Sequence, residues 1–190
     1  MSASTARAKR FGPEAVATPA NFITIARLLF AIPTLILIER QGATWLTVSL
    51  WFVLSCTDGV DGWIARRDGT TRSGAFLDPL ADKVLTIGGF VALLARGDIW
   101  WVPVALIATR EILVSIYRSA AARRGISLPA RQLGKWKAAL QMLAVGAYVF
   151  PPVKDMTELK LSILWIAVAF TIVSGIDIVR RGWQETVSAD

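Results

Sequence analysis

The 190-residue sequence predicts an all-α, polytopic membrane protein, a bundle of six transmembrane helices with a short N-terminal surface segment. Three observations lead to this prediction. Apolar residues make up 54% of the chain and charged residues 18%, with a mean hydropathy of +0.52, whereas soluble domains are about 25% charged. The apolar residues gather in six runs. The basic residues gather between these runs, mostly on one side.

Each apolar run has about the length that a helix needs to cross a hydrocarbon core, roughly 17–25 residues. No cleavable signal peptide is expected, because Glu14 and Pro19 precede the first run and no small-residue cleavage site follows it. We expect one membrane domain at 19–182, a cytoplasmic juxtamembrane segment at 1–18 and a cytoplasmic tail at 183–190. The six predicted spans cover 21–38, 44–64, 78–95, 99–121, 134–152 and 161–179.

The distribution of Lys and Arg predicts the orientation. With six spans both termini share one side of the membrane, and that side carries 14 basic residues against four on the other. Positive charge collects in cytoplasmic loops, so the termini and the loops around 65–77 and 122–133 are expected in the cytoplasm. The chain is thus predicted to be a multi-pass integral protein of the cell or inner membrane. Its net charge of +7 suits the lipid bilayer or an anionic substrate better than nucleic acid.

Four aspartates lie near the predicted cytoplasmic ends of the second and third spans. Asp58 and Asp61 are three residues apart, and Asp78 and Asp82 are four apart, so each pair shares one face of a helix. A chain reversal around 67–74 brings the two helix ends together. A carboxylate at the centre of a membrane helix costs about 2.5–3.5 kcal/mol, so four such residues point to a function. The alternative is that the aspartates cap helix ends and pair with arginines.

The composition limits what this cluster can bind. The chain has no His and a single cysteine, which nearly excludes zinc chemistry and any internal disulfide. A site made of oxygen ligands suits Mg²⁺ or Mn²⁺. Two such ions held by shared carboxylates recur in phosphoryl-transfer enzymes.

The residues of this region also carry a family resemblance. They read Asp58-x-x-Asp61-Gly62-x-x-Ala65-Arg66, followed by Gly74-x-x-x-Asp78-x-x-x-Asp82. This pattern resembles the signature of the CDP-alcohol phosphatidyltransferases, with a spacer before the second segment one residue shorter than the usual one. The resemblance covers most of the chain. It implies an enzyme that transfers a phosphatidyl group from CDP-diacylglycerol to an alcohol and releases CMP, and that works as a homodimer.

The resemblance implies a role for each motif residue. Asp58, Asp61 and Asp78 would hold two divalent cations, and Asp82 would be the catalytic general base and a further metal ligand. For Asn21 and Thr24 a simple helix cap is an equally weighted alternative. The residues implied for binding the CDP-lipid are Asn21, Thr24, Gly62, Ala65, Arg66, Thr71 and Gly74.

Basic residues beside the carboxylates predict the seat of an anionic acceptor. Arg110 also has a structural reading, an ion pair with Glu111 or an aspartate, and Lys135 could instead extend its amine toward the membrane surface. The predicted acceptor ligands are Arg110, Arg118, Arg131 and Lys135.

Two further stretches resemble the phosphatidylglycerophosphate synthase branch of the family. They are Thr109-Arg110-Glu111 and Gly134-Lys135-Trp136-Lys137-x-x-x-Gln141. This branch implies sn-glycerol 3-phosphate as the acceptor and phosphatidylglycerophosphate as the product, in phospholipid synthesis. Two alternatives stay open. One is a related enzyme that uses phosphatidylglycerol, giving cardiolipin, or inositol phosphate. The other, from a different class, is a cation transporter or channel with the carboxylates as its translocation site.

Overall fold

The structure is a computed structural model that describes residues 18–68, 72–125 and 132–187. Within these ranges, the side chains at 58–68, 72, 75 and 185–187 are not described. The described residues form six α-helices and one short 3₁₀ helix, which confirms the all-α prediction. They are α1 (Pro19–Gln41), α2 (Trp45–Asp68), α3 (Arg72–Arg96), α4 (Trp101–Arg123), α5 (Gln132–Val149), η1 (Pro151–Val153) and α6 (Thr157–Val187).

Two stretches of the described helices are long and apolar enough to cross a membrane by length and composition alone. They are Pro19–Gln41 and Thr157–Gln184, and a shorter apolar stretch covers Trp45–Thr57. The helices α3, α4 and α5 carry charged side chains within their apolar sequences. The structure therefore establishes six helices, whereas six membrane crossings stay a prediction.

The helices extend beyond the predicted spans at the end that holds the carboxylates. α2 continues to Asp68 and α3 already begins at Arg72, so most of the loop expected around 65–77 is helical. α6 runs on to Val187, so the described part of the predicted 183–190 tail is helical too. Apolar runs mark the part of a helix that suits hydrocarbon, whereas the backbone hydrogen bonds of a helix continue through polar residues outside it.

Local signals define both ends of α1. Thr18 is the N-cap, since its Oγ1 accepts a hydrogen bond from the Asn21 backbone N–H at 3.2 Å. Pro19 takes the first helical position, where its missing N–H costs nothing. The helix ends at Gln41 and is capped by Gly42, whose φ of +63° suits glycine and whose N–H donates to the Ile38 carbonyl.

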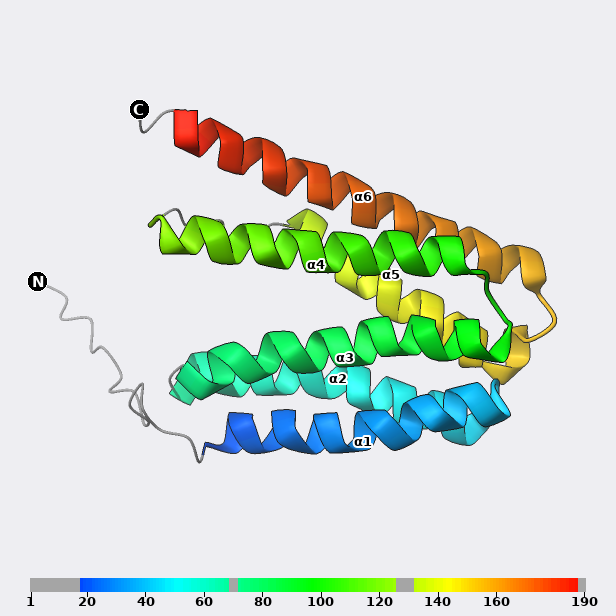
Figure 1. The fold of residues 1–190 in the computed structure, drawn as a ribbon. Helices are drawn as coiled ribbons and strands as arrows, with labels where there is room; N and C mark the ends of the chain where they lie inside the picture. The colour runs from blue at the N-terminus through cyan, green and yellow to red at the C-terminus, as the bar shows by residue number, and fades with distance from the viewer. Residues whose placement is uncertain (1–17, 69–71, 126–131, 188–190) are drawn as a thin grey trace, which may run out of the picture.

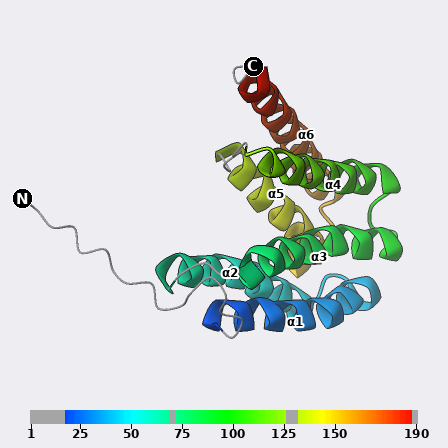
Figure 2. The same ribbon diagram turned by 60° about the vertical axis from the view of Figure 1, so that its left-hand side comes forward.

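The helices run alternately up and down and form two groups (Figure 1). α1 packs against α2 and α3, and α6 packs against α4 and α5, with α3 and α4 in contact between the groups. The turned view shows the same division, with α1, α2 and α3 on one side and α4, α5 and α6 on the other (Figure 2). One end of the bundle gathers the start of α1, α3 and α5 and the end of α2, α4 and α6 (Figure 1).

The apolar core fills the opposite end of the bundle. Its members come from the second halves of α1, α3 and α5 and the first halves of α2, α4 and α6, as Leu85, Phe90, Val145 and Leu164 illustrate. A Cβ at Gly89 would lie 2.8 Å from the Trp51 ring, so this glycine leaves room for the Trp51 side chain of α2 against α3. The core thus packs one end tightly and leaves polar residues to the other.

The outward faces of the bundle are apolar as well. Large apolar side chains with at least 60% of their surface exposed occur on every one of the six helices. Soluble monomers rarely carry apolar surface on all sides, whereas a lipid-facing helix does. Examples, one per helix in order, are Phe22, Phe52, Phe76, Trp101, Trp136 and Trp183.

Candidate active site

Polar side chains join the first turns of α1 and α3. Asn21 Nδ2 donates a hydrogen bond to Ser73 Oγ at 2.7 Å, and Thr24 Oγ1 donates to Asp78 Oδ1 at 2.8 Å. Asn21 and Thr24 are only 2% and 0% exposed. The side chain that caps α1 is that of Thr18. The side chains of Asn21 and Thr24, for which a cap was the alternative role, bond to α3. The structure therefore brings the predicted residues Asn21, Thr24 and Asp78 together.

Two more predicted residues lie on the same face of α3. Gly74 precedes Asp78 by one helical turn and is buried, and Asp82 follows it by one turn. Asp78 and Asp82 are half-buried. Three of the predicted site residues thus form one stripe along α3, next to the start of α1.

The other predicted members of the carboxylate and nucleotide site lie outside the described side chains. Asp58, Asp61, Gly62, Ala65 and Arg66 belong to the last turns of α2, whose backbone ends beside the start of α3 (Figure 1). Thr71 and Arg131 lie outside the described residues altogether. The convergence of all four aspartates therefore stays a prediction.

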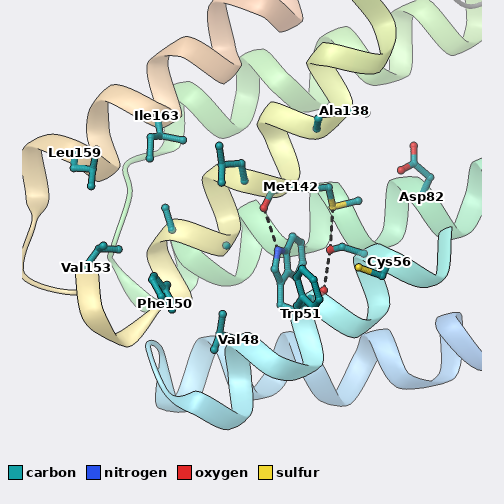
Figure 3. Close-up of a pocket in the computed structure, with 16 residues that line it drawn as sticks. Val48, Trp51, Cys56, Asp82, Ala138, Met142, Phe150, Val153, Leu159 and Ile163 are labelled. Atoms are coloured by element: carbon teal, nitrogen blue, oxygen red, sulfur yellow. Dashed lines mark hydrogen bonds between the residues drawn. The ribbon is translucent and has the colours of Figure 1, made fainter. Parts of the chain in front are cut away.

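A cavity of about 760 Å³ opens beside Asp82 (Figure 3). Asp82 lies at one end of it, near Cys56 of α2 and Ala138 of α5, and Val153 and Leu159 lie at the other end (Figure 3). Among the described lining residues Asp82 is the only charged one, so its carboxylate lies at one end of a largely apolar cavity. The lining comprises Val48, Trp51, Phe52, Ser55, Cys56, Asp82, Ala138, Ala139, Met142, Leu143, Gly146, Ala147, Phe150, Val153, Leu159 and Ile163.

The cavity wall is held together across α2 and α5. The Trp51 indole Nε1 donates to the Met142 carbonyl at 3.1 Å. Ser55 Oγ donates to the Trp51 carbonyl at 2.8 Å and lies 3.5 Å from Met142 Sδ. The contacts of Trp51 and Ser55 with Met142 tie α2 to α5 along the wall of the cavity (Figure 3).

Arg110 is bound by its own neighbour and by α6. Its Nη1 donates to Glu111 Oε1 at 3.0 Å, its Nε to the Thr171 carbonyl at 3.0 Å, and its Nη2 to Ser174 Oγ at 2.9 Å. Only 12% of its side chain is exposed. The ion pair with Glu111, the structural reading of this residue, is therefore present. Contact between Arg110 and an acceptor stays a prediction.

Lys137 and Gln141, which the sequence marks only as part of the stretch that resembles the synthase branch, complete this network. Lys137 Nζ donates to Glu111 Oε1 at 2.7 Å, and Gln141 Nε2 donates to Thr171 Oγ1 at 2.9 Å and lies 3.5 Å from Glu111 Oε1. Lys137 and Gln141 are 6% and 0% exposed. Their spacing of four residues, which puts them on one helix face, is the signal that could have revealed them.

Arg118 and Lys135 differ from Arg110 in their surroundings. Arg118 lies about two turns beyond Arg110 on α4, and its Nε is buried with no hydrogen-bond partner among the described residues. A buried donor without a partner costs about 1–3 kcal/mol, which an anion at this place would offset. Lys135, near the start of α5, is exposed. Both residues lie at the end of the bundle that carries the aspartates.

The donor chemistry on α3 fits a hard divalent cation. Asp78 and Asp82 supply carboxylate oxygens one turn apart, and the Thr24 hydroxyl bond orients one of them. The chain has no imidazole, and its single thiol, Cys56, lines the apolar cavity. Oxygen ligands without nitrogen or sulfur favour Mg²⁺ or Mn²⁺.

Comparison with known proteins places this arrangement in a family. The family model described as CDP-alcohol phosphatidyltransferase matches residues 17–173. A Mycobacterium tuberculosis protein named probable phosphatidylglycerophosphate synthase is 36% identical over 182 residues, covering 92% of this chain and 86% of that protein. A protein of Rickettsia bellii and one of Haemophilus influenzae are both named CDP-diacylglycerol–glycerol-3-phosphate 3-phosphatidyltransferase. They are 39% and 33% identical, over 82% and 80% of this chain and 90% and 85% of their own lengths.

The matched region runs from the start of α1 into α6 and includes the signature aspartates. The resemblance inferred from the two aspartate segments is thus confirmed. The chain belongs to the CDP-alcohol phosphatidyltransferase family.

Proposed function

We propose that the protein transfers the phosphatidyl group of CDP-diacylglycerol to sn-glycerol 3-phosphate, releases CMP and forms phosphatidylglycerophosphate. The observation that carries this proposal is the placement of Asp82, a signature carboxylate, at the end of an apolar cavity. Relatives that align over most of the chain are named for this reaction. Family membership favours an enzyme over a cation channel.

We infer that all six helices cross the membrane, with the termini and the active site in the cytoplasm. Apolar side chains exposed on every helix support the six crossings. The excess of Lys and Arg at the end that gathers the start of α1 and the end of α6 supports the orientation. A reaction at this end draws the lipid from the bilayer and the water-soluble acceptor from the cytoplasm. The homodimer implied by the family resemblance is part of the proposal.

The proposed lipid seat is the apolar cavity. Its volume lies within the roughly 300–1,000 Å³ typical of ligand pockets. α5 rises about 14 Å between Ala138 and Ala147, at ~1.5 Å per residue. The cavity that these residues line is therefore long enough to hold a large part of an acyl chain. Acyl chains placed there would bring the phosphorus of the lipid to Asp82, while the nucleotide would lie toward Asn21, Thr24 and Gly74. The remaining nucleotide contacts proposed are Gly62, Ala65, Arg66 and Thr71.

Asp82 supplies the acid–base chemistry in this proposal. Its carboxylate accepts the proton of the acceptor hydroxyl, and the hydroxyl oxygen forms a bond to the phosphorus that carries diacylglycerol. The bond from this phosphorus to the CMP phosphate breaks, and CMP leaves. Asp58, Asp61, Asp78 and Asp82 would hold two divalent cations, Mg²⁺ or Mn²⁺, which neutralise the pyrophosphate charge when bound. Thr24 orients Asp78 for this task through its hydrogen bond.

The proposed acceptor seat lies between α4 and α5 at the cytoplasmic end. The buried Arg118 Nε without a partner among the described residues and the exposed Lys135 support it. A dianionic phosphate matches two or more such cations. Arg110 and Arg131 complete the proposed set, Arg110 from a position fixed by α6.

A side-by-side acceptor assay tests the function. The purified protein is given CDP-dioleoylglycerol with sn-glycerol 3-phosphate, phosphatidylglycerol or inositol phosphate, with and without EDTA, and CMP release and lipid product are measured. Of the three acceptors, we expect only sn-glycerol 3-phosphate to give CMP release, and this release to depend on Mg²⁺ or Mn²⁺. Turnover with another acceptor would move the protein to that branch of the family. Metal flux into proteoliposomes without CMP release would contradict the enzyme.

A further inference from the structure

Glu111, Lys137 and Gln141 link α4 to α5 through buried polar contacts that the proposed reaction does not use. We call these three residues the Glu111 clamp. Within the described residues, the backbones of α4 and α5 scarcely approach each other, whereas each packs along α6. The bonds from Lys137 and Gln141 to Glu111 Oε1, at 2.7 and 3.5 Å, span this separation. They therefore help to decide where α5 lies relative to α4.

The clamp is costly to bury. The side chains of Glu111 and Lys137 are 9% and 8% exposed, and the carboxylate is shared with Arg110, so two cations meet one anion. Apolar side chains of the same size would often stabilise a helix bundle equally well or better. Its cost therefore favours a role in defining the geometry of the helices rather than in stability.

α5 has one face toward the proposed lipid cavity and another toward Glu111 of α4. Ala138 and Met142 line the cavity that ends at Asp82. Lys137 faces Glu111, and Lys135 is exposed at the cytoplasmic end of the same helix. A shift of α5 would therefore change the distance between Lys135 and Arg118 of α4.

We propose that the Glu111 clamp is a positioning device for the acceptor site. By holding α5 at a defined distance from α4, it keeps Lys135 and Arg118 at the spacing that an anionic acceptor needs. Glu111, Lys137 and Gln141 act through other residues and do not touch the reacting atoms. The inference rests on the proposed function for its substrate, and its structural part can be tested without turnover.

Kinetics of Lys137 variants test the effect on the acceptor. In Lys137→Met we expect the KM for sn-glycerol 3-phosphate to rise about tenfold or more, and the KM for CDP-diacylglycerol to change less than about twofold, as the loss of one charge-assisted contact predicts. Lys137→Arg still donates to Glu111 and should restore the acceptor KM. Lys154→Met, the same substitution at an exposed lysine beyond η1, is the matched control and should leave both KM values unchanged.

A paired substitution guards against a variant that fails to fold. Glu111→Gln/Lys137→Met leaves no buried carboxylate without its lysine, and Arg110 keeps its bonds to the Thr171 carbonyl and Ser174 Oγ. We therefore expect a folded protein that keeps the acceptor KM defect. A paired variant with the normal acceptor KM would overturn the proposal. So would a Lys137→Met enzyme in which both KM values rise equally or neither changes.

A distance measurement tests the clamp independently of activity. Spin labels at Ile116→Cys on α4 and Leu143→Cys on α5, both exposed positions, are introduced in a Cys56→Ser background. Lys137→Met should broaden or shift the distance distribution, and Lys137→Arg should preserve it. An unchanged distribution in Lys137→Met would overturn the positioning role. Failure of the unsubstituted protein to use sn-glycerol 3-phosphate would refute the proposed function instead, and leave this measurement meaningful.

Discussion

Thr24 of α1 donates a hydrogen bond of 2.8 Å to Asp78 of α3, although 54 residues separate them in the sequence. Thr24 is fully buried and Asp78 is half-buried. The bond ties the first predicted span to a signature carboxylate of the third. It also gives the carboxylate a defined orientation before any cation binds.

Thr24→Val should lower activity, because it removes the hydrogen bond that orients the Asp78 carboxylate. A hydrogen bond to a charged group contributes about 1.5–3 kcal/mol, so kcat/KM should fall at least about tenfold. The Mg²⁺ concentration that gives half-maximal activity should rise. Thr34→Val is a close control, because Thr34 is as buried on the same helix and its hydroxyl donates to the Phe30 carbonyl, as the Thr24 hydroxyl does to the Ala20 carbonyl. The bond of Thr34 stays within α1, whereas Thr24 also reaches Asp78. Equal losses in both variants would refute a specific role for Thr24. Initial rates over a Mg²⁺ titration provide the measurement.

Asp82→Asn should reduce turnover by orders of magnitude and leave nucleotide binding largely intact. General-base catalysis contributes about 10²–10⁴-fold, so kcat should fall by that range. Binding of CDP-diacylglycerol is measured separately, by calorimetry or by protection against thermal unfolding. Asp98→Asn, which breaks the Arg96–Asp98 ion pair between α3 and α4, controls for loss of an aspartate remote from the site. Normal turnover in Asp82→Asn would remove this residue from the base role.

A large side chain introduced into the cavity should raise the KM for lipids with long acyl chains more than the KM for lipids with short ones. Gly146→Ala should be tolerated, because the added Cβ would lie an ordinary 3.5 Å from Trp51 Nε1. Gly146→Phe should raise the KM for CDP-dioleoylglycerol about tenfold, the equivalent of excluding roughly two methylene groups from apolar surroundings. The KM for a dioctanoyl lipid should rise less. Identical effects on both lipids would show that the acyl chains lie elsewhere.

Removing Arg118 or Lys135, two of the four proposed acceptor cations, should weaken acceptor binding selectively. For Arg118→Ala and Lys135→Ala we expect the KM for sn-glycerol 3-phosphate to rise about tenfold or more, as loss of a charge-assisted bond to phosphate predicts. The KM for CDP-diacylglycerol should change little. Arg124→Ala, at an exposed arginine just after α4, should affect neither constant. Parallel changes in both KM values would argue against an acceptor site between α4 and α5.

Much of the fold could be predicted from hydropathy, because the length of an apolar run is a physical requirement of the bilayer. The number and order of the helices followed from six such runs. Helix ends did not, because α2 and α3 continue through charged residues at 65–77 and α6 continues to Val187. Hydropathy falls at these residues, whereas the backbone hydrogen bonds of a helix do not depend on it.

The candidate site was predictable to the extent that spacing along one helix defines it. Gly74, Asp78 and Asp82 share a face of α3 because they are four residues apart. The same spacing joins Lys137 to Gln141, but nothing in the sequence says that their partner is Glu111 of another helix. Of the two neighbouring lysines on α5, the sequence favoured Lys135 as the functional one and left Lys137 unassigned.

The sequence by itself determined the family and the kind of chemistry, since the residue types and spacings of the two aspartate segments are local properties. Only the tertiary structure decided the partners across helices: Asn21 with Ser73, Thr24 with Asp78, and Lys137 with Glu111. Such partners depend on how each helix is rotated and packed. That rotation is selected by the whole set of buried contacts, and no short stretch of sequence contains it.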